Sequence, residues 1–504
     1  MTTRTPNRLI PADFPTMPGV DALEAVVVTA GAPTEEADAI GYLVFTDAEV
    51  PAGLGLDREA LVRAGFEAKA GSSLLAPTSS GPEIIAVGVG ELAELTADTL
   101  RDAAASLVRA ATTRSRFAVV AGELGGVEAG AAAQALTEGA VLARYKYTAT
   151  KPTNKHVALQ SLSIQVPGET PIESAIAAGL LDARATVVAR DLTNTPPGHL
   201  TATNIGEISV QLGERFGFEV ELFDKAALTE LGCGGLLGVN RGSAEEPRMV
   251  KLTYRPAGES TGHLGLIGKG IMYDSGGISL KPSDAMHLLM KMDMGGAAAV
   301  LGAVAAMRDR GVTATVTGWL MCTDNMPSGD SYKLGDVLVS RDGTTIEVKN
   351  TDAEGRLVMS DAFGLANEEG VDAIIDIATL TGSALMTFGV NRAPVYANDD
   401  ALAETVLAAS VAVDEPLWRM PLERRYRKQL DSEIADISNL GGPYAGATTA
   451  ALFLDHFAGK TPWAHLDIAG TMQTEKDDSW RTAGATGFGA RLLLQTAAAF
   501  RPQP

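Results

Sequence analysis

Charged side chains flanked by glycine occur in three segments of the second half of the chain. The first is Gly268–Gly277 (GKGIMYDSGG), which Lys281 follows closely; the second is Met290–Gly296 (MKMDMGG), and the third is Asn350–Leu357 (NTDAEGRL). Together they contribute seven charged side chains: Lys269, Asp274, Lys281, Asp293, Asp352, Glu354 and Arg356. Four of these are carboxylates, and the other three are cationic side chains.

A phosphate-binding loop is one interpretation of these glycines, but the residue order argues against it. The Walker pattern requires Ser or Thr directly after Gly-Lys, whereas Gly270 follows Lys269. Val87–Gly90 (VGVG) resembles part of a dinucleotide-binding fingerprint but lacks its third glycine. We therefore expect no nucleotide cofactor.

A site for divalent cations fits these segments better. Asp352 and Glu354 are two positions apart, so extended backbone would turn both side chains to one side. Four converging carboxylates would repel one another and raise their pKa values, and two dications would remove this repulsion. Oxygen ligands without thiolates favour Mn, Mg, Co or Zn. Two such metals about 3.5–4 Å apart suit hydrolysis, because they polarise a carbonyl and generate a bridging hydroxide.

The metal site depends on the three segments meeting in space, because a single Asp in a glycine loop is more often a turn former. Three apolar runs are predicted as central strands: His263–Ile267, Ala314–Leu320 and Ala373–Ala378. Helices are predicted at Gly296–Arg310 and Met359–Glu369, each ending before a glycine. Ligands in open α/β sheets bind beyond the carboxyl ends of the strands, where the acidic segments fall.

The N-terminal third shows the same alternation of strands and helices. Strands are predicted at Ala25–Thr29, Ile84–Val89 and Phe117–Ala121, and helices at Leu92–Ala111 and Ala131–Tyr145. A long helix at Ile172–Leu192 precedes the breaker cluster NTPPG at Asn194–Gly198. We predict an α/β protein with a smaller N-terminal α/β domain at residues 1–180. The larger domain, residues 181–504, carries the site on a mixed, mostly parallel sheet flanked by helices.

Composition excludes several classes of protein. The 504 residues are 46% hydrophobic and 20% charged, which is typical of a globular protein. The formal net charge of −21 argues against nucleic acid and anionic membranes as partners. Cys233 and Cys322 are too few for a disulfide framework and favour a reducing compartment. Without a signal-peptide pattern or an apolar run of about 18 residues, we expect a cytoplasmic protein.

The three segments resemble those of the leucyl (cytosol) aminopeptidase family. NTDAEGRL is similar to the family signature, GKGIMYDSGGISLKP to its lysine–aspartate segment, and MKMDMGGAA to its next metal-binding segment. Five further matches are RDLTNTPPGHLT at Arg190–Thr201, NMPSGD at Asn325–Asp330, ATLTG at Ala378–Gly382, PWAHLDIAG at Pro462–Gly470 and GATGFG at Gly484–Gly489. The N-terminal third carries no motif of its own.

The resemblance implies a two-metal aminopeptidase that acts through a metal-bridging hydroxide. One cation would be held by Asp274, Asp352 and Glu354. The backbone carbonyl of Asp352 would add a further oxygen ligand. The other cation would be held by Lys269, Asp274, Asp293 and Glu354. A lysine ligand must be deprotonated, which nearby dications favour. Manganese and zinc are both candidates for the two sites.

The resemblance also implies catalytic and substrate-binding residues. Lys281 would stabilise the developing oxyanion, and Arg356 would hold a bicarbonate ion that serves as general base, helped by the backbone near Leu380. The histidines, His287 and His465 among them, are then expected to be structural. The substrate-binding residues would be Met290, Asn350, Thr379, Leu380, Gly382, Ala469 and Met472. This mostly apolar set predicts a preference for Leu- or Met-like N-terminal residues, although either methionine alone would suggest core packing.

Some features depart from the family pattern or leave alternatives open. Tyr332–Asp336 (YKLGD) stands where the family usually has Arg-Pro before Gly-Asp, which could alter a loop or a subunit contact. The family forms homohexamers around an inner cavity that admits short peptides, so a homohexamer is expected. The alternatives are a narrower dipeptidase, such as a Cys-Gly hydrolase, and a non-catalytic binding protein on the same scaffold.

Overall fold

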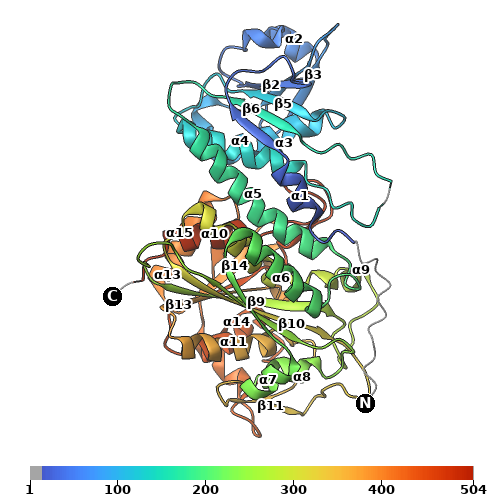
Figure 1. Ribbon diagram of the computed structural model, residues 1–504, viewed down its shortest axis with the longest axis vertical. Helices are drawn as coiled ribbons and strands as arrows, with labels where there is room; N and C mark the ends of the chain where they lie inside the picture. Colours follow the sequence, from blue (N-terminus) through green and yellow to red (C-terminus); the bar gives the residue numbers. More distant parts are fainter. Residues whose placement is uncertain (1–13, 152, 503–504) are drawn as a thin grey trace. The chain divides into compact units, whose positions relative to one another are not determined.

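The structure is a computed structural model that describes residues 14–151 and 153–502 (Figure 1). By its contacts the chain divides into two compact units. The N-terminal unit comprises Met17–Val187 together with Thr474–Gly484, and the C-terminal unit consists chiefly of Val188–Gln473. The predicted domain boundary at residues 180/181 falls within helix α5 (Glu173–Asn194), along which the chain passes from one unit to the other.

The N-terminal unit contains a six-stranded sheet. Its order is β1 (Val27–Ala30), β6 (Ser161–Gln165), β5 (Arg116–Val120), β2 (Ala39–Val44), β4 (Glu83–Gly88) and β3 (Ser73–Ala76). All neighbours are parallel except β3 and β4. Helices α3 (Ala97–Ala110) and α4 (Ala129–Ala143) pack against each other beside it. The helix predicted from Leu92 begins only at Ala97, because the Thr96 hydroxyl caps it by accepting the Thr99 N–H.

The C-terminal unit is built on an eight-stranded sheet. Its order is β15 (Leu417–Arg419), β14 (Ala393–Ala397), β17 (Trp463–Asp467), β13 (Ala373–Ala378), β9 (His263–Asp274), β10 (Thr315–Asn325), β8 (Arg248–Tyr254) and β7 (Glu219–Phe223). The four central strands β17, β13, β9 and β10 are parallel, whereas β14 runs antiparallel to β17 and β8 to both β10 and β7. This confirms the predicted α/β fold with a mixed, mostly parallel central sheet.

Helices cover both faces of this sheet (Figure 1). One layer contains α6 (Ala202–Phe216), α10 (Gly295–Arg310), α13 (Asp400–Ala412) and α15 (Ala490–Ala499). The opposite layer contains α8 (Gly234–Asn240), α11 (Gly355–Glu369) and α14 (Gly446–Ala458). Both α10 and α11 pack on β9 and bury nearly all of their first three turns. The first turns of these two helices therefore lie against the strand that carries the first charged segment.

Two central strands are longer than predicted. The run predicted at His263–Ile267 continues as β9 to Asp274, and the next strand, β10, continues to Asn325. Glycine is unfavourable in strands, so the glycines after Ile267 led to a prediction that was too short. At Gly268 the missing side chain lets α10 pack closely on β9, since a Cβ there would lie 2.6 Å from the Ala297 Cα. The prediction that the first charged segment follows the strand was wrong; Lys269 and Asp274 lie on it.

The remaining elements are short. The helices are α1 (Pro18–Glu24), α2 (Arg58–Arg63), α7 (Lys225–Leu231), α9 (Ala285–Leu288) and α12 (Gly382–Phe388). Turns of 3-10 helix occupy Ala52–Leu54, Leu92–Glu94, Met290–Met292 and Arg424–Leu430. The small strands are β11 (Val337–Val339), β12 (Thr345–Glu347), β16 (Ile437–Ser438), β18 (Gln473–Thr474) and β19 (Gly484–Ala485). In the described part of the chain, no helix is both long and apolar enough to cross a membrane.

Candidate active site

The carboxylates of the three segments meet around the end of β9. Asp274 ends this strand, and Asp293 lies between a 3-10 turn and α10. Asp352 lies in a turn, and Glu354 has helical backbone angles (φ −76°, ψ −35°) as the residue before α11. The prediction that Asp352 and Glu354 share extended backbone was therefore wrong. They converge because the turn leads directly into a helix that packs on β9.

Lys269 connects two of the segments from the middle of β9. Its Nζ lies 2.8 Å from Asp293 and 2.9 Å from Oε1 of Glu354, and it donates to the Thr379 carbonyl at 2.9 Å. Burial alone would lower the pKa of Lys269, but the surrounding carboxylates, Asp293 first, hold it above its ordinary value. In this structure Lys269 is thus the cation that pairs with both Asp293 and Glu354.

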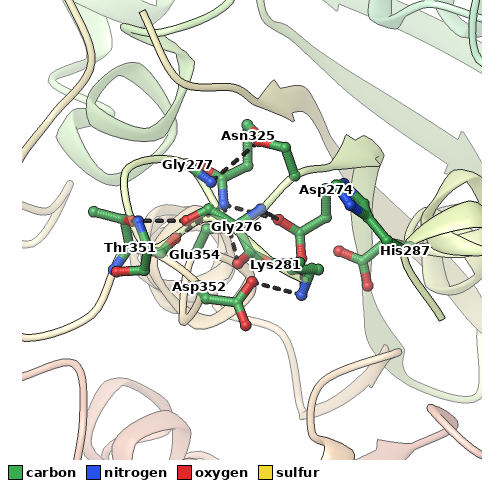
Figure 2. A network of polar contacts seen from close by, with 12 residues as sticks. Asp274, Gly276, Gly277, Lys281, His287, Asn325, Thr351, Asp352 and Glu354 are labelled. Carbon is green, nitrogen blue, oxygen red and sulfur yellow. Dashed lines mark hydrogen bonds and ion pairs between the residues drawn. The ribbon is translucent and has the colours of Figure 1, made fainter. Parts of the chain in front are cut away.

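Lys281 connects the other two carboxylates. Its Nζ lies 2.8 Å from Oδ2 of Asp274 and 2.5 Å from Oδ1 of Asp352. The three residues are labelled in Figure 2. Burial opposes its charge, yet Asp274 and the other carboxylates raise its pKa above the ordinary value. Its side chain is 20% exposed, and Lys281 lines the cavity described below.

The carboxylates themselves form a site that suits hard cations. One oxygen from each of Asp274, Asp352 and Glu354 lies within 4.8 Å of the others. Burial and the neighbouring Glu354 charge raise the pKa of Asp274 to about 6, and the same two causes raise that of Asp352. Burial raises the pKa of Asp293 as well. The raised pKa values show that the two ammonium groups do not fully compensate the negative charges of the carboxylates. Divalent cations would therefore fit this set of oxygen donors.

Asn325 is a neighbour of the metal-binding carboxylates to which the sequence assigned no role. It ends β10, and its Nδ2 donates to Oδ1 of Asp274 at 2.9 Å and to the Thr351 carbonyl at 2.9 Å, with Oε2 of Glu354 at 3.3 Å (Figure 2). Tyr332 is fully buried and donates its hydroxyl to the same Thr351 carbonyl at 2.7 Å. The NMPSGD motif was the only signal for Asn325, and it does not reveal the contact.

Arg356, on the first turn of α11, is buried beside this cluster. Its Nη1 donates to the Asn439 carbonyl at 2.9 Å. Its Nε is buried and has no hydrogen-bond partner among the residues that the structure describes. Burial lowers the pKa of Arg356 to about 10, against the opposing charges of Glu354 and Asp467. A buried, unpaired guanidinium donor is what an anion-binding residue requires.

A cavity of about 240 Å³ opens beside the charged cluster. Its charged lining consists of Lys269, Asp274, Lys281, Asp293, Asp352 and Glu354. Its other lining residues are Met286, Met290, Met292, Thr379, Leu380, Thr381, Gly382, Leu385 and Ala469. Five of the seven predicted substrate-binding residues thus line it: Met290, Thr379, Leu380, Gly382 and Ala469. Sequence reasoning missed Met286, Met292, Thr381 and Leu385, which carry no distinctive spacing.

The other two predicted substrate-binding residues lie outside the cavity lining. Met472 is fully buried, and its Sδ would lie 2.7 Å from a Cβ at Gly295, so it packs under the start of α10. Asn350 accepts the Asp352 N–H on its Oδ1 at 2.8 Å and so shapes the turn that presents Asp352. Both residues therefore contact segments that carry the charged cluster, and neither lines the cavity.

His465 lies in the core as predicted. It is fully buried on β17, with its Nδ1 2.6 Å from Oδ1 of Asp376 and its ring stacked on Trp463. His287, on α9, stacks on the Tyr273 ring with centroids 5.9 Å apart. Neither ring belongs to the lining of the cavity.

Comparisons with known proteins agree on one family. The model for the catalytic domain of the cytosol aminopeptidase family matches residues 187–494, and that for the family's N-terminal domain matches residues 49–154. A "Probable cytosol aminopeptidase" of Solibacter usitatus is 39% identical over 427 residues, covering 84% of this chain and 88% of that protein. One of Chlorobaculum tepidum is 40% identical over 472 residues, covering 88% and 92%.

Solved structures show the same similarity. The bottromycin maturation enzyme BotP in complex with Mn matches with a TM-score of 0.85 and 39% identity, covering 92% of this chain and 99% of that one. A second BotP structure matches with a TM-score of 0.83 and 38% identity over the same shares of both chains. The resemblance therefore extends over both units of the chain.

Proposed function

Because the chain belongs to the cytosol aminopeptidase family and is a metallo-exopeptidase, we propose that it removes Leu- or Met-like residues from the N-termini of short peptides. One observation carries this proposal: four carboxylates line a cavity whose uncharged lining is mostly apolar. Such a lining would bind a free α-amine and the scissile carbonyl through its charged residues and an apolar side chain through its apolar ones.

Two divalent cations would supply the Lewis acidity, polarising the peptide carbonyl and lowering the pKa of water. Asp274, Asp352 and Glu354 would hold one of them. Lys269, Asp274, Asp293 and Glu354 would hold the other, after Lys269 has lost its proton. The Mn complex of the related BotP supports manganese as one candidate, and zinc remains the other.

Two cationic side chains would then serve the reaction. Lys281 lines the cavity and would donate a hydrogen bond to the carbonyl oxygen as negative charge develops on it. Arg356 would hold bicarbonate through its unpaired Nε, and the bicarbonate would accept a proton from water as general base. The Leu380 N–H donates to Asp467 at 3.1 Å, so it would serve this anion only as a shared donor.

The preferred side chain follows from the apolar part of the cavity. Three methionines, Met286, Met290 and Met292, line it together with Leu385 and Ala469. Methionine side chains adapt to irregular apolar shapes and offer no charge to pair with Asp, Glu, Lys or Arg of a substrate. We therefore expect unbranched or γ-branched apolar residues to be released fastest.

A substrate panel tests this proposal. The protein is stripped with a chelator and reloaded with Mn²⁺ or Zn²⁺, and release of Leu, Met, Ala, Glu and Lys from their amides is measured. We expect Leu and Met amides to react fastest and an Asp352→Ala variant to lose activity. Equal rates for charged and apolar residues would contradict the specificity, and complete inactivity of both metal forms would contradict the activity.

Two alternatives are separated by the same assay. Faster hydrolysis of Cys-Gly than of leucine amide at saturating Mn²⁺ would favour the narrower dipeptidase. The presence of all seven predicted charged residues argues against a non-catalytic binding protein.

We propose a homohexamer in the cytoplasm, supported by the family to which the chain belongs and by the names of its relatives. Light scattering of the purified protein would test the assembly. A monomer at micromolar concentration would contradict it.

A further inference from the structure

A buried carboxylate outside the metal-binding set lies behind the apolar part of the cavity. Asp467 is the last residue of β17, and its exposed fraction is 1%. It forms no ion pair with any residue that the structure describes. The buried Arg356 guanidinium acts on this carboxylate only through longer-range attraction. The direct partners of Asp467 are therefore hydrogen-bond donors, which a buried carboxylate requires.

Within the described residues, the hydrogen bonds that the Asp467 carboxylate accepts come from residues that line the cavity. Its Oδ1 accepts the backbone N–H groups of Leu380 at 3.1 Å, Thr381 at 3.3 Å and Ala469 at 3.3 Å. Its Oδ2 accepts the Thr381 hydroxyl at 2.7 Å. Leu380, Thr381 and Ala469 line the cavity, whereas Asp467 does not. One carboxylate thus joins the segment after β13 to the segment after β17.

The same wall segment is anchored at its other end to the metal-binding residues. The Thr379 carbonyl accepts from Lys269 at 2.9 Å, and the Thr379 hydroxyl donates to Asp293 at 2.8 Å. Residues 379–381 therefore span from the charged cluster to Asp467. Releasing the Asp467 end would leave the two contacts of Thr379 in place.

Asp467 also orients the helix that follows this segment. The Thr381 hydroxyl donates to Asp467 and accepts the Ala384 N–H at 3.0 Å, which caps α12. α12 carries Leu385, another residue of the apolar lining. A change at Asp467 would therefore move both the loop and the helix that bound the side-chain end of the cavity.

We propose that Asp467 is a positioning residue that sets the distance between residues 380–382 and Ala469, and thereby selects the size of the N-terminal side chain that the cavity accepts. The inference rests on the proposed function of this cavity. It predicts that Asp467 affects which substrate is chosen and leaves cation binding nearly unchanged.

The test compares Asp467→Ala and Asp467→Asn with a matched control, Asp376→Asn. Asp376 is a fully buried carboxylate on the adjacent strand β13, and it accepts from Trp463 and His465 away from the cavity. The Asn variant at position 467 keeps one oxygen for the three N–H groups, while Ala loses every contact. Measurements are kcat and KM for leucine and alanine amides, Mn²⁺ affinity by calorimetry, and thermal melting.

We expect the leucine-to-alanine ratio of kcat/KM to fall about tenfold or more in Asp467→Ala, mainly through KM for leucine amide, and less in Asp467→Asn. Mn²⁺ affinity stays within about threefold of wild type, because the contacts of Thr379 remain. Asp376→Asn lowers the melting temperature and leaves the ratio unchanged. An unchanged ratio in both Asp467 variants overturns the proposal, as does an equal loss for both amides accompanied by a loss of Mn²⁺ affinity.

Binding of free L-leucine and L-alanine to the Mn²⁺-loaded protein separates this proposal from the proposed activity. If wild type hydrolyses neither amide, the proposed activity fails. The role of Asp467 then stands only if leucine binds more tightly than alanine and Asp467→Asn reduces that difference. If Asp467→Ala does not fold, Asp467→Asn and Thr381→Val, which removes the hydroxyl bonded to Oδ2, decide the question by the same ratio.

Discussion

Asn325 donates its side-chain amide to Asp274 across 2.9 Å, from the end of one central strand to the end of its neighbour. The same nitrogen lies 3.3 Å from Glu354, so one neutral group contacts the two carboxylates proposed to bridge a pair of cations. A hydrogen bond from a fixed amide orients a carboxylate without competing for its charge. This relationship leads to the first prediction.

Replacing Asn325 by Ala should weaken binding of Mn²⁺ by about 10–100-fold, the usual effect of removing a group that orients a metal ligand. Calorimetric titration of the chelator-treated protein measures the affinity directly. Asn367→Ala is the matched control, since its amide also donates to a backbone carbonyl, that of Phe457, but lies away from the site. Equal affinities for wild type and Asn325→Ala would contradict the prediction.

Gly355→Ala should disrupt the site although alanine favours helices. A Cβ at position 355 would lie 2.7 Å from Nζ of Lys269, whose end is held by Asp293, Glu354 and Thr379. Displacing Lys269 should cost about 1–3 kcal/mol of folding free energy, measured by denaturant unfolding, and should weaken Mn²⁺ binding.

Gly130→Ala on α4 provides the control for that substitution. The nearest atom to its added Cβ is Ala175 Cβ at 3.7 Å, an ordinary contact, so this change should be neutral or stabilising by about 0.5–1 kcal/mol. If Gly355→Ala and Gly130→Ala have the same free energy of unfolding, the explanation by close approach of residue 355 to Lys269 is wrong.

Lys281→Met should separate catalysis from cation binding. The ammonium group pairs with Asp274 and Asp352 and lines the cavity, so its loss should lower kcat by about 10²–10³-fold. Mn²⁺ affinity should stay equal or rise, because a competing positive charge is gone. Lys349→Met, at a lysine 3.6 Å from Glu347 and outside the cavity lining, should retain wild-type kcat. A parallel loss of kcat and Mn²⁺ affinity in Lys281→Met would argue against the assigned role.

Asp361 should make stability fall as pH rises. Burial raises the pKa of this carboxyl to about 7 from 3.8, although it accepts backbone N–H groups of Leu236, Arg341 and Gly235. Between about pH 4 and 7 the folded protein therefore binds more protons at Asp361 than the unfolded chain. The favourable contribution to the free energy of unfolding is complete below the pKa that Asp361 has in the unfolded chain. It is lost as the pH rises through the pKa that Asp361 has in the folded protein.

Comparison with Asp361→Asn isolates this contribution. With a chelator present, wild type should lose up to about 1.4 kcal/mol of stability per pH unit relative to the variant across that window. Denaturant unfolding at pH 4.5, 5.5 and 6.5 measures the difference. A difference that stays constant with pH would show that Asp361 is ionised in the folded protein throughout.

Local patterns predicted the elements well where helix or strand preference agrees with burial. The helix predicted at Gly296–Arg310 begins one residue earlier and ends at Arg310 as predicted, before Gly311, whose left-handed φ of 70° suits a glycine. The strand at Ala373–Ala378 was confirmed at both ends. Errors arose at the site itself. β9 continues beyond Ile267 through two glycines, Gly268 and Gly270, to Asp274, and α11 begins at Gly355 instead of Met359. Close packing of helix on strand outweighs the usual low preference of glycine for either element.

The order and spacing of the charged segments were sufficient to identify the family, and therefore the class of reaction, because motif residues and their order are properties of the chain itself. They also supplied the inventory of carboxylates and lysines. Only the tertiary structure decided how these groups pair: Lys269 with Asp293 and Glu354, Lys281 with Asp274 and Asp352. The places of Asn325 and Asp467 were decided in the same way. Their partners lie on other segments, and only the strand order of the folded sheet brings those segments within hydrogen-bonding distance.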